Sequence, residues 1–379
     1  MNNAQLTIKL INVSDKNNNK YYDMINNGNG TFTVKFGRVG ASPMTKNYPI
    51  NRWDTIYREK INKNYKDITS NFKASNSEFL FKSDDIKEFY NIFSKNVNNV
   101  VSTNYLVDNV NKTVIDECKK LIKDLSYHNI NLSNEVLLEI FKLIPRKMNN
   151  VNNFLVKDLK DINLIVERET DLLDTLSSKM NLQITESIDF CDFFNIEMNI
   201  VNNDEVNKFL NSTNNTSSKI YKLFSFKHKV TENNFDNWVK DQENKTTKLL
   251  IHGTKNGNIF NIFKTGLLIR PSTAVSFAGS AYGDGIYHSF HTSKSLGYAD
   301  YSNNKLLLIQ DVHLGNYYTY KGWFRESKDL SRNELNYNSL KNKGYDSLYV
   351  EAGDGLLNSE YIVYNAQQTT TKYLAWLQS

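Results

Sequence analysis

Alternating apolar and polar residues mark the first part of the chain. LTIKLINV at 6–13 alternates with a period of two, which is typical of a half-buried strand. NGNG at 27–30 predicts a hairpin turn, because Asn and Gly tolerate positive φ, and TFTVKFGRVG at 31–40 returns as a second strand. A helix is expected around 53–63, where apolar residues recur at helical spacing: Ile50, Trp53, Ile56, Tyr57 and Ile61. Residues 1–75 therefore predict a small β-rich unit.

Residues 76–212 show the spacing of amphipathic helices. One helical face of VIDECKKLIKDL carries Val114, Cys118, Leu121 and Leu125, so Cys118 is expected in a core and not as a nucleophile. LSNEVLLEIFKLIP predicts a helix with Ser133 as its N-cap and a stop at Pro145. RETDLLDTLSSKM predicts a further helix, and the polar run NSTNNTSS at 211–218 predicts a surface loop at a boundary.

Short apolar strands return in residues 213–379. They are expected at LLIHGT, GIYHS, KLLLIQDV, DSLYVE, EYIVYNA and YLAWL. Helices are expected at NIFNIFKTG, which Gly266 would end, and at TSKSLGYADYS. The third block is therefore β-dominated, like the first.

Composition limits the class of protein. The 379 residues allow two or three domains with packed cores, and 40% hydrophobic with 23% charged residues is ordinary for a soluble protein. No apolar run is long enough to span a bilayer and the N-terminus lacks a secretory layout, so neither a membrane nor a secreted protein is expected. Cys118 and Cys191 imply no disulfide framework and fit a reducing compartment.

The net charge of +5 is unevenly spread along the chain. Residues 1–75 carry twelve Lys or Arg against five Asp or Glu, whereas the other 304 residues carry 34 against 36. A positive excess at one end indicates a module that faces a polyanion, with nucleic acid as the first candidate. A basic surface that only keeps the protein soluble is the alternative.

Several common catalytic motifs are missing from the sequence. It has no phosphate-binding GxxxxGKS/T loop, no GxGxxG after a strand and no GxSxG elbow. His288 and His291 form an HxxH pair, but no third ligand lies at a telling spacing, so no metal site is expected.

Other residues of the third block remain as candidates for chemistry. His252 ends a strand before Gly253, and the glycines of YGDGIY let a ligand approach the backbone before Tyr287. The next helix places Ser295 and Tyr298 three residues apart on one face. A hydroxyl beside an aromatic ring suits a flat ring that carries an amide, because such a ring can stack and form hydrogen bonds together.

The order of these motifs resembles a known family. LLIHGT, the GLLIRPSTA turn, YGDGIY, SKSLGY and NSEYIVYNAQQTTTKYLAWL are similar to the catalytic domain of the poly(ADP-ribose) polymerases. KFGRVG, the basic helix and NKNYKDIT resemble that family's WGR domain, and the middle block resembles its α-helical regulatory domain. The resemblance implies an α+β multidomain protein with a WGR-like DNA-binding domain at 1–75, an all-α regulatory domain at 76–212, and an ADP-ribosyltransferase domain of two packed, mainly antiparallel sheets at 213–379.

The resemblance implies NAD as the substrate, with no metal. The backbone of Gly253 and the hydroxyl of Ser295 would hold the nicotinamide carboxamide. Tyr298 would stack on the nicotinamide ring, with Tyr287 on its other side.

The same resemblance assigns the ribose end of NAD. His252 would bind a ribose hydroxyl, and Glu360 would bind the 2-hydroxyl of the nicotinamide ribose and orient or deprotonate the incoming hydroxyl. Thr254 and Lys294 would line the same cleft. Cleavage builds positive charge on the sugar, which a nearby carboxylate stabilises. In the family a His-Tyr-Glu set accompanies polymer synthesis, and the chain keeps all three residues.

The first block differs from the family pattern at one position. Phe36 stands where the WGR motif has Trp, so a stacking face is kept and the indole donor is lost. Arg38 is the best candidate for contact with a DNA phosphate and for relaying a signal, while Phe36 and Trp53 are weaker DNA-binding candidates that could be core residues. In the third block His288 follows Tyr287 where Phe is usual, and the span from His252 to Glu360 is short.

The function expected from these features is NAD-dependent poly(ADP-ribose) synthesis on protein acceptors, of which the chain itself could be one, stimulated by DNA strand breaks. Such a protein would be nuclear in a eukaryote and otherwise cytoplasmic. Two alternatives stay open. One is a mono-ADP-ribosyltransferase on the same scaffold, and the other is a DNA-end binding protein with a vestigial catalytic domain.

Overall fold

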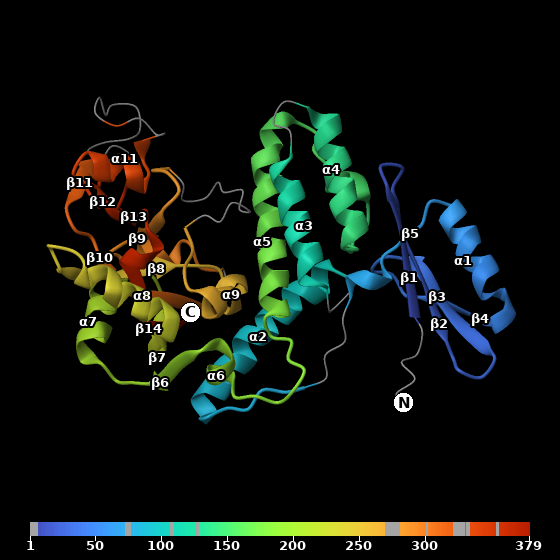
Figure 1. Ribbon diagram of the computed structural model, residues 1–379, viewed down its shortest axis with the longest axis horizontal. Coiled ribbons are helices and arrows are strands. Elements are labelled where there is room, and N and C mark those ends of the chain that lie inside the picture. Colours follow the sequence, from blue (N-terminus) through green and yellow to red (C-terminus); the bar gives the residue numbers. More distant parts are fainter. Residues whose placement is uncertain are drawn as a thin grey trace. The chain divides into compact units, whose positions relative to one another are not determined.

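The computed structural model describes residues 7–72, 77–106, 110–125, 129–269, 281–300, 302–320, 330, 334–353 and 356–379 (Figure 1). These residues form two compact units. Within the described ranges the first unit holds residues 7–72 and 98–180, and the second holds 77–97 and the residues from 181 onward. Part of the GLLIRPSTA turn, from position 270, lies outside the described residues. No helix in the described part is long and apolar enough to cross a membrane.

An antiparallel sheet opens the first unit, with strand order β4-β3-β2-β1-β5. Its strands are β1 (Thr7–Ser14), β2 (Asn18–Asn26), β3 (Thr31–Arg38), β4 (Met44–Pro49) and β5 (Lys66–Asp67). The turn at 27–30 is confirmed, with Gly28 and Gly30 at positive φ, but it joins β2 to β3. The stretch predicted as the second strand is therefore the third, because β2 was not predicted. In β2 the neighbouring Tyr21 and Tyr22 are both buried, which breaks the alternation that reveals a strand.

The helix predicted around 53–63 is confirmed as α1 (Trp53–Asn62), and it packs on this sheet. Ile56 is buried among Leu10, Phe32 and Val34 of the sheet. The outer members of the predicted apolar face are exposed instead, with Ile50 at 38% and Ile61 at 37%. A short helix buries a narrow stripe, so only the middle of the pattern reaches the core.

Three further helices lie wholly in the first unit: α3 (Lys112–Lys123), α4 (Ile130–Leu143) and α5 (Ile162–Met180). Cys118 is fully buried, and burial raises the pKa of its thiol well above the ordinary value, which fits the predicted core role. The prediction of Ser133 as N-cap was wrong, because the helix begins earlier and the Asn129 side chain accepts from the backbone N–H of Leu132. Ser133 is buried inside the helix.

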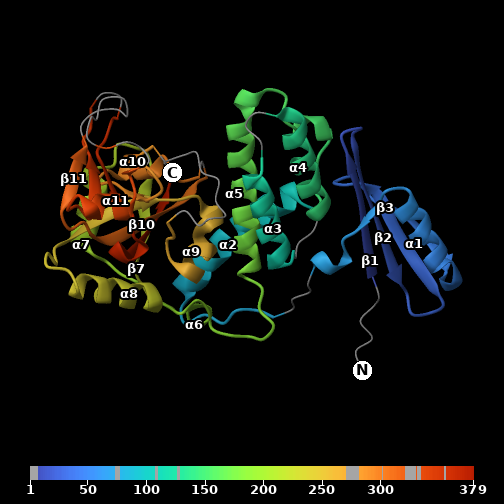
Figure 2. The same ribbon diagram turned by 45° about the horizontal axis from the view of Figure 1, so that its top comes forward.

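The second unit contains two sheets (Figure 1, Figure 2). The five-stranded sheet, in the order β6-β7-β14-β10-β8, is antiparallel throughout and consists of β6 (Ile196–Ile200), β7 (Lys219–His228), β14 (Thr369–Gln378), β10 (Asn304–His313) and β8 (Thr247–Gly253). The four-stranded sheet, in the order β11-β12-β13-β9, consists of β11 (Tyr317–Tyr320), β12 (Ser347–Val350), β13 (Glu360–Val363) and β9 (Ile286–His288). One pair, β11 with β12, is parallel. Mixed helices and mainly antiparallel sheets are therefore confirmed.

Apolar side chains from both sheets share one core. Leu250 of β8 and Val312 of β10 pack with Ile286 of β9 and Val363 of β13. The remaining helices are α2 (Asp84–Asn104), which contributes residues to both units, and α6 (Phe190–Phe194), α7 (Asp204–Ser212), α8 (Lys229–Lys240), α9 (Ile259–Thr265), α10 (Thr292–Leu296) and α11 (Tyr337–Asn342). Helix α9 ends at Gly266 as predicted, where a Cβ atom would lie 2.4 Å from Thr231 Cγ2.

The expected domain boundary at 212 falls between two paired strands. β6 precedes it, yet β6 pairs with β7 over five residue pairs. The stretch before the boundary therefore contains a strand of the five-stranded sheet, which is followed by helix α7 up to Ser212. The division at 75 and 212 into three domains stays a prediction.

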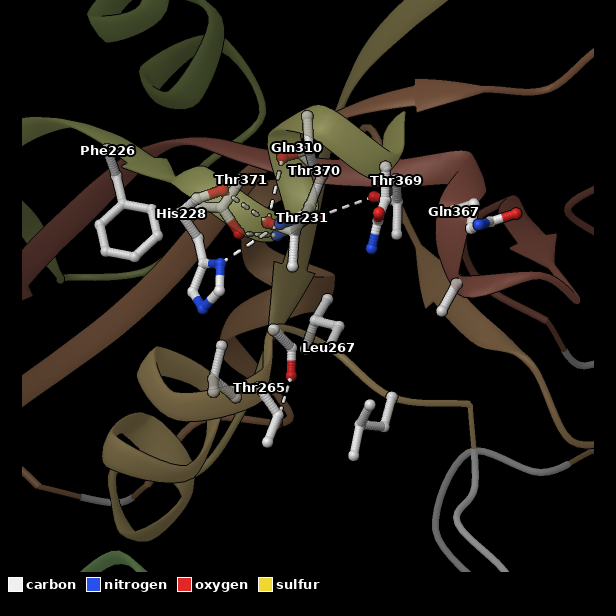
Figure 3. Close-up of a pocket in the computed structure, with 15 residues that line it drawn as sticks. Phe226, His228, Thr231, Thr265, Leu267, Gln310, Gln367, Thr369, Thr370 and Thr371 are labelled. Carbon is white, nitrogen blue, oxygen red and sulfur yellow. Dashed lines mark hydrogen bonds between the residues drawn. The ribbon is translucent and has the colours of Figure 1, made fainter. Parts of the chain in front are cut away.

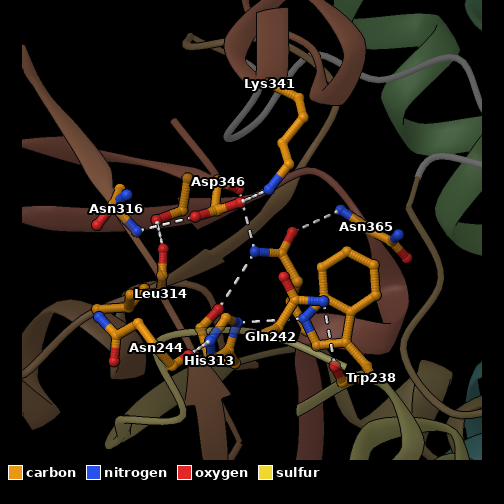
Figure 4. A network of polar contacts seen from close by, with 11 residues as sticks. Trp238, Gln242, Asn244, His313, Leu314, Asn316, Lys341, Asp346 and Asn365 are labelled. Atoms are coloured by element: carbon orange, nitrogen blue, oxygen red, sulfur yellow. Dashed lines mark hydrogen bonds and ion pairs between the residues drawn. The ribbon is translucent and has the colours of Figure 1, made fainter. Parts of the chain in front are cut away.

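Polar side chains also tie the second unit together (Figure 4). Trp238 of α8 donates its indole N–H to His313 Nδ1 at 3.1 Å, and His313 Nε2 donates to the Asn244 carbonyl at 2.5 Å. Gln368 donates to the carbonyls of His313 and Asp346. Both nitrogens of the His313 ring are used in this network, so His313 holds the scaffold and has no free nitrogen for chemistry.

Candidate active site

The end of β8 and helix α10 approach each other closely. A Cβ atom at Gly253 would lie 1.8 Å from the carbonyl oxygen of Ser295. The Ser295 side chain is buried and donates its hydroxyl to the Ile251 carbonyl at 3.2 Å. Glycine is therefore required here for contact between two parts of the chain, in addition to any ligand.

His252 lies beside Gly253 on β8 and contacts the next sheet. Its Nδ1 is 2.8 Å from the Tyr287 carbonyl oxygen. A carbonyl can only accept, so Nδ1 carries the hydrogen and Nε2 keeps a free lone pair. Burial lowers the pKa of His252, which keeps the ring neutral. The side chain thus offers a hydrogen-bond acceptor at Nε2.

The Gly-Asp-Gly turn fixes the hydroxyl of Tyr287. That hydroxyl donates to the Gly283 carbonyl and accepts from the Tyr282 backbone N–H, both at 2.8 Å. Gly283 has a φ of +85°, and a Cβ atom there would lie 2.3 Å from the Leu335 carbonyl oxygen. Burial raises the pKa of Tyr287 well above the ordinary value. The ring position of Tyr287 is therefore set by the turn that precedes it.

A buried ion pair lies at the start of β13. Lys294 Nζ is 2.9 Å from Glu360 Oε1, with the two side chains 12% and 6% exposed. Lys294 also donates to the Asn358 carbonyl at 3.0 Å. A buried carboxylate without a partner is strongly unfavourable, and Lys294 compensates its charge. Sequence reasoning gave Lys294 no definite role.

The negative charge of Glu360 contributes to the raised pKa values of three tyrosines. Burial, and then the Glu360 carboxylate, raise the pKa values of Tyr282 and Tyr298. Glu360 also contributes to the raised pKa of Tyr287. Tyr298 is 40% exposed, so its ring is open to contact from outside. Thr254 is buried directly after β8.

The structure thus brings the eight predicted residues of the third block into one unit, and six of them form three direct contacts: His252 with Tyr287, Gly253 with Ser295, and Lys294 with Glu360. Their assignment to parts of NAD stays a prediction. Among the described residues no group of three or more His, Cys, Asp or Glu could hold a metal ion. A small cavity of about 140 Å³ in the same unit is lined by His228, Gln310 and Thr369 to Thr371 among others (Figure 3).

Sequence reasoning missed a polar cluster behind His252. His288 is 2% exposed, and its ring meets the His252 ring edge to face with centroids 6.0 Å apart. His288 Nε2 is 3.3 Å from Thr369 Oγ1. These residues are 81 positions apart, so sequence spacing could not connect them. The unusual His after Tyr287 was the one available signal.

The three DNA-binding candidates lie in the first unit. The Arg38 guanidinium donates to the carbonyl and side-chain oxygens of Asn17 and to the carbonyls of Met148 and Asn149. Phe36 packs against Tyr22 with ring centroids 5.6 Å apart, and Trp53 meets Phe32 edge to face. Phe36 and Trp53 thus contribute to the core of the sheet and helix. Arg38 joins the end of β3 to the segment after α4.

Comparison with known proteins supports the catalytic part of this interpretation. Residues 197–378 match the family model described as the poly(ADP-ribose) polymerase catalytic domain. The match begins in β6. It includes every residue of the three contacts described above.

Three relatives cover different shares of the chain. The putative poly [ADP-ribose] polymerase-like 100L of Invertebrate iridescent virus 6 is 42% identical over 171 residues, which is 45% of this chain and 92% of that protein. The uncharacterized protein 101L of the same virus is 34% identical over 200 residues, 51% of this chain and 85% of that protein. Poly [ADP-ribose] polymerase 1 of Gallus gallus is 31% identical over 154 residues, 35% of this chain and 15% of that protein.

The viral relatives are covered almost completely, whereas the chicken enzyme is covered over a small part of its length. The similarity at this level, together with the match over β6 to β14, assigns the chemistry of the third block. The chain belongs to the poly(ADP-ribose) polymerase family and is an ADP-ribosyltransferase that uses NAD.

Proposed function

We propose that this chain synthesises poly(ADP-ribose) on protein acceptors, with Glu360 as the catalytic carboxylate. One observation carries the proposal. Glu360 is buried and ion-paired at the start of β13. Its negative charge contributes to the raised pKa of Tyr287, and the backbone carbonyl of Tyr287 accepts a hydrogen bond from His252. The His-Tyr-Glu set that accompanies polymer synthesis in the family is thus held by three strands of one unit.

His252 and Glu360 would act at the ribose end of NAD. His252 presents an acceptor at Nε2, because Nδ1–H is used by Tyr287, and a sugar hydroxyl can donate to it. Glu360 would stabilise the positive charge that builds on the sugar during cleavage, and would accept a proton from the incoming hydroxyl. Lys294 would hold Glu360 in place before the reaction.

Ser295, Gly253, Tyr298 and Tyr287 would hold the nicotinamide end. The Ser295 hydroxyl hydrogen is used by the Ile251 carbonyl, and its oxygen keeps lone pairs that can accept from the carboxamide N–H. The exposed face of Tyr298 supplies a stacking surface. Thr254 would line the cleft beside Gly253. Rigid holding of the ring lowers the barrier by orienting the bond that breaks.

The test of polymer synthesis is incubation with labelled NAD, followed by a denaturing gel. Polymerisation predicts a ladder of products on protein. One discrete shifted band would show mono-ADP-ribosyl transfer, and no label would support a vestigial catalytic domain. Each outcome selects one of the three functions.

Stimulation by DNA breaks is the regulatory part of the proposal. Its support is the positive excess in residues 1–75 and the four hydrogen bonds of Arg38 to Asn17, Met148 and Asn149. Because carbonyl oxygens already use the Arg38 donors, we assign Arg38 to relay between the sheet and the helical part more than to phosphate contact. DNA can activate only if it binds the active state better than the inactive one.

The matching experiment compares initial rates of NAD consumption with and without nicked duplex DNA. Arg38→Ala should reduce the DNA-stimulated rate and leave the basal rate unchanged. If DNA changes the rate of neither protein, the regulatory proposal is overturned while the transferase assignment stands. This experiment also tests the proposed relay through Arg38 between the stretches 1–75 and 76–212.

A further inference from the structure

We propose that His288 is a positioning residue for ADP-ribosyl transfer, and that a buried chain of polar side chains from β9, β14 and β10 acts through it to hold the His252 ring. The inference rests on the proposed role of His252 in binding a ribose hydroxyl. It adds a second layer of residues, none of which would touch NAD.

The rings of the two histidines are in direct contact. The rings of His252 and His288 meet edge to face, with centroids 6.0 Å apart. The hydrogen bond from Nδ1 of His252 to the Tyr287 carbonyl fixes one edge of that ring. His288 packs against the ring from the neighbouring strand, so a shift of His288 changes the direction of His252 Nε2.

Hydrogen bonds among buried side chains fix the orientation of His288. Gln310 Nε2 donates to Thr371 Oγ1 at 2.6 Å, and Gln310 Oε1 accepts from Thr369 Oγ1 at 2.7 Å (Figure 3). The single hydroxyl hydrogen of Thr369 is therefore used by Gln310. Thr369 Oγ1 must then accept from His288 Nε2, 3.3 Å away. The tautomer and ring orientation of His288 follow from this chain of bonds.

The burial of polar side chains around His288 argues against a role as ordinary core filling. His288, Gln310, Thr369 and Thr371 are each at most 7% exposed. Burying four polar side chains is unfavourable unless their hydrogen bonds are made, and an apolar set of the same volume would pack without that requirement. The bonds between Gln310, Thr369, Thr371 and His288 Nε2 are made, whereas the buried His288 Nδ1 has no hydrogen-bond partner among the described residues. A phenyl ring at 288 could touch His252 but could not be anchored by Thr369. The polar chain therefore specifies where the ring lies.

The test is a double-mutant cycle between Thr369 and His252, read as KM for NAD and kcat. Valine has the shape of threonine without the hydroxyl, so Thr369→Val frees His288 from its anchor. The loss of one neutral hydrogen bond corresponds to a change in affinity of about 3- to 10-fold. We therefore expect KM for NAD to rise by that factor, with a smaller change in kcat. In the His252→Ala background the same substitution should change KM no further, because the ring that it positions is gone.

Two matched variants separate positioning from stability. Thr370→Val removes a hydroxyl from the next residue of β14, which donates to Glu232 Oε2 at 3.1 Å, and it should leave KM unchanged. Thr369→Ser keeps the hydroxyl and should restore the wild-type KM. If Thr369→Val fails to fold, His288→Phe enters the cycle in its place, with the same expected non-additivity.

If Thr369→Val, or His288→Phe, raises KM for NAD by the same factor in the wild-type and His252→Ala backgrounds, the inference is overturned. A wild-type KM for Thr369→Val would overturn it as well. If His252→Ala itself leaves KM unchanged, the proposed role of His252 at the ribose fails, which is a separate result. The cycle thus distinguishes failure of the positioning chain from failure of the site.

Discussion

Each unit contains a buried ion pair, and the two pairs are built differently. In the first unit Arg146 pairs with Glu169, and both side chains are at most 2% exposed. Arg168 bonds the second carboxylate oxygen of Glu169, Asn104 accepts from Arg146, and aromatic rings of Tyr105, Phe141 and Phe154 surround the guanidinium. In the second unit Lys294 pairs with Glu360 through one oxygen and has one carbonyl as a further partner.

The difference indicates what each pair is for. Arginine with its fixed fork suits a permanent, fully bonded pair, whereas lysine is a compact charge on a flexible stem. Every side-chain nitrogen and oxygen atom of the Arg146–Glu169 pair has a hydrogen-bond or ion-pair partner except Arg146 Nε. The pair therefore links the segment after α4 to α5. The Lys294 pair holds its carboxylate through a single oxygen atom. A carboxylate held in this way can exchange its partner for a substrate hydroxyl.

The largest expected effect is a difference in how much the loss of each ion pair lowers the free energy of unfolding. Glu169→Ala should lower the free energy of unfolding by about 3–5 kcal/mol, because it leaves Arg146 buried without a charge partner. Glu360→Ala should lower it less, since Lys294 is more exposed. Urea unfolding monitored by circular dichroism measures both. A larger loss for Glu360→Ala would reverse the comparison.

An intermediate effect concerns pH. Burial, and then His252, lower the pKa of His288 to about 3 from an ordinary 6.5. Below pH 6.5 the unfolded chain binds a proton that the folded chain does not, so stability falls as the pH drops toward 3. At pH 5 this amounts to about 2 kcal/mol. His288→Phe should remove that part of the slope, as measured by unfolding at pH 7 and pH 5; an unchanged slope would argue against it.

The smallest expected effect concerns Tyr298. If its exposed ring stacks on nicotinamide, Tyr298→Ala should weaken a benzamide-like competitor by about 1 kcal/mol, which is the scale of one aromatic pair. Titration calorimetry measures the change. Tyr221 is 45% exposed in the same unit and carries no assigned role, so Tyr221→Ala is the matched control. Equal affinity for wild type and Tyr298→Ala would refute the stacking role.

Much of the fold could be predicted from local pattern. Alternation located β1 and β3, and the apolar strands of the third block lie where they were expected. β2 was missed because Tyr21 and Tyr22 are both buried in succession. Ser133 was misread as a cap because Asn129 and Asn131, which can also cap a helix, precede it, and Asn129 caps the helix instead. Local sequence does not determine which of several polar residues takes such a position.

The candidate site could be predicted as a set of residues but not as a set of contacts. Glycines 253 and 283 were chosen for ligand approach, and the structure adds that Ser295 and Leu335 backbones would clash with a side chain there. The Lys294–Glu360 pair joins residues 66 positions apart, and the chain from His288 to Gln310 joins three strands. Such pairings depend on how the sheets register, which spacing in the sequence does not reveal.

The central claim is that Glu360 in its Lys294 pair drives chain extension. The most direct test measures the rate at which labelled NAD is built into polymer by wild type and Glu360→Gln, with NAD affinity determined alongside. We expect NAD still to bind and elongation to fall by about 100- to 10,000-fold, the range of general acid–base help. Long polymer made by Glu360→Gln at the wild-type rate would contradict the account.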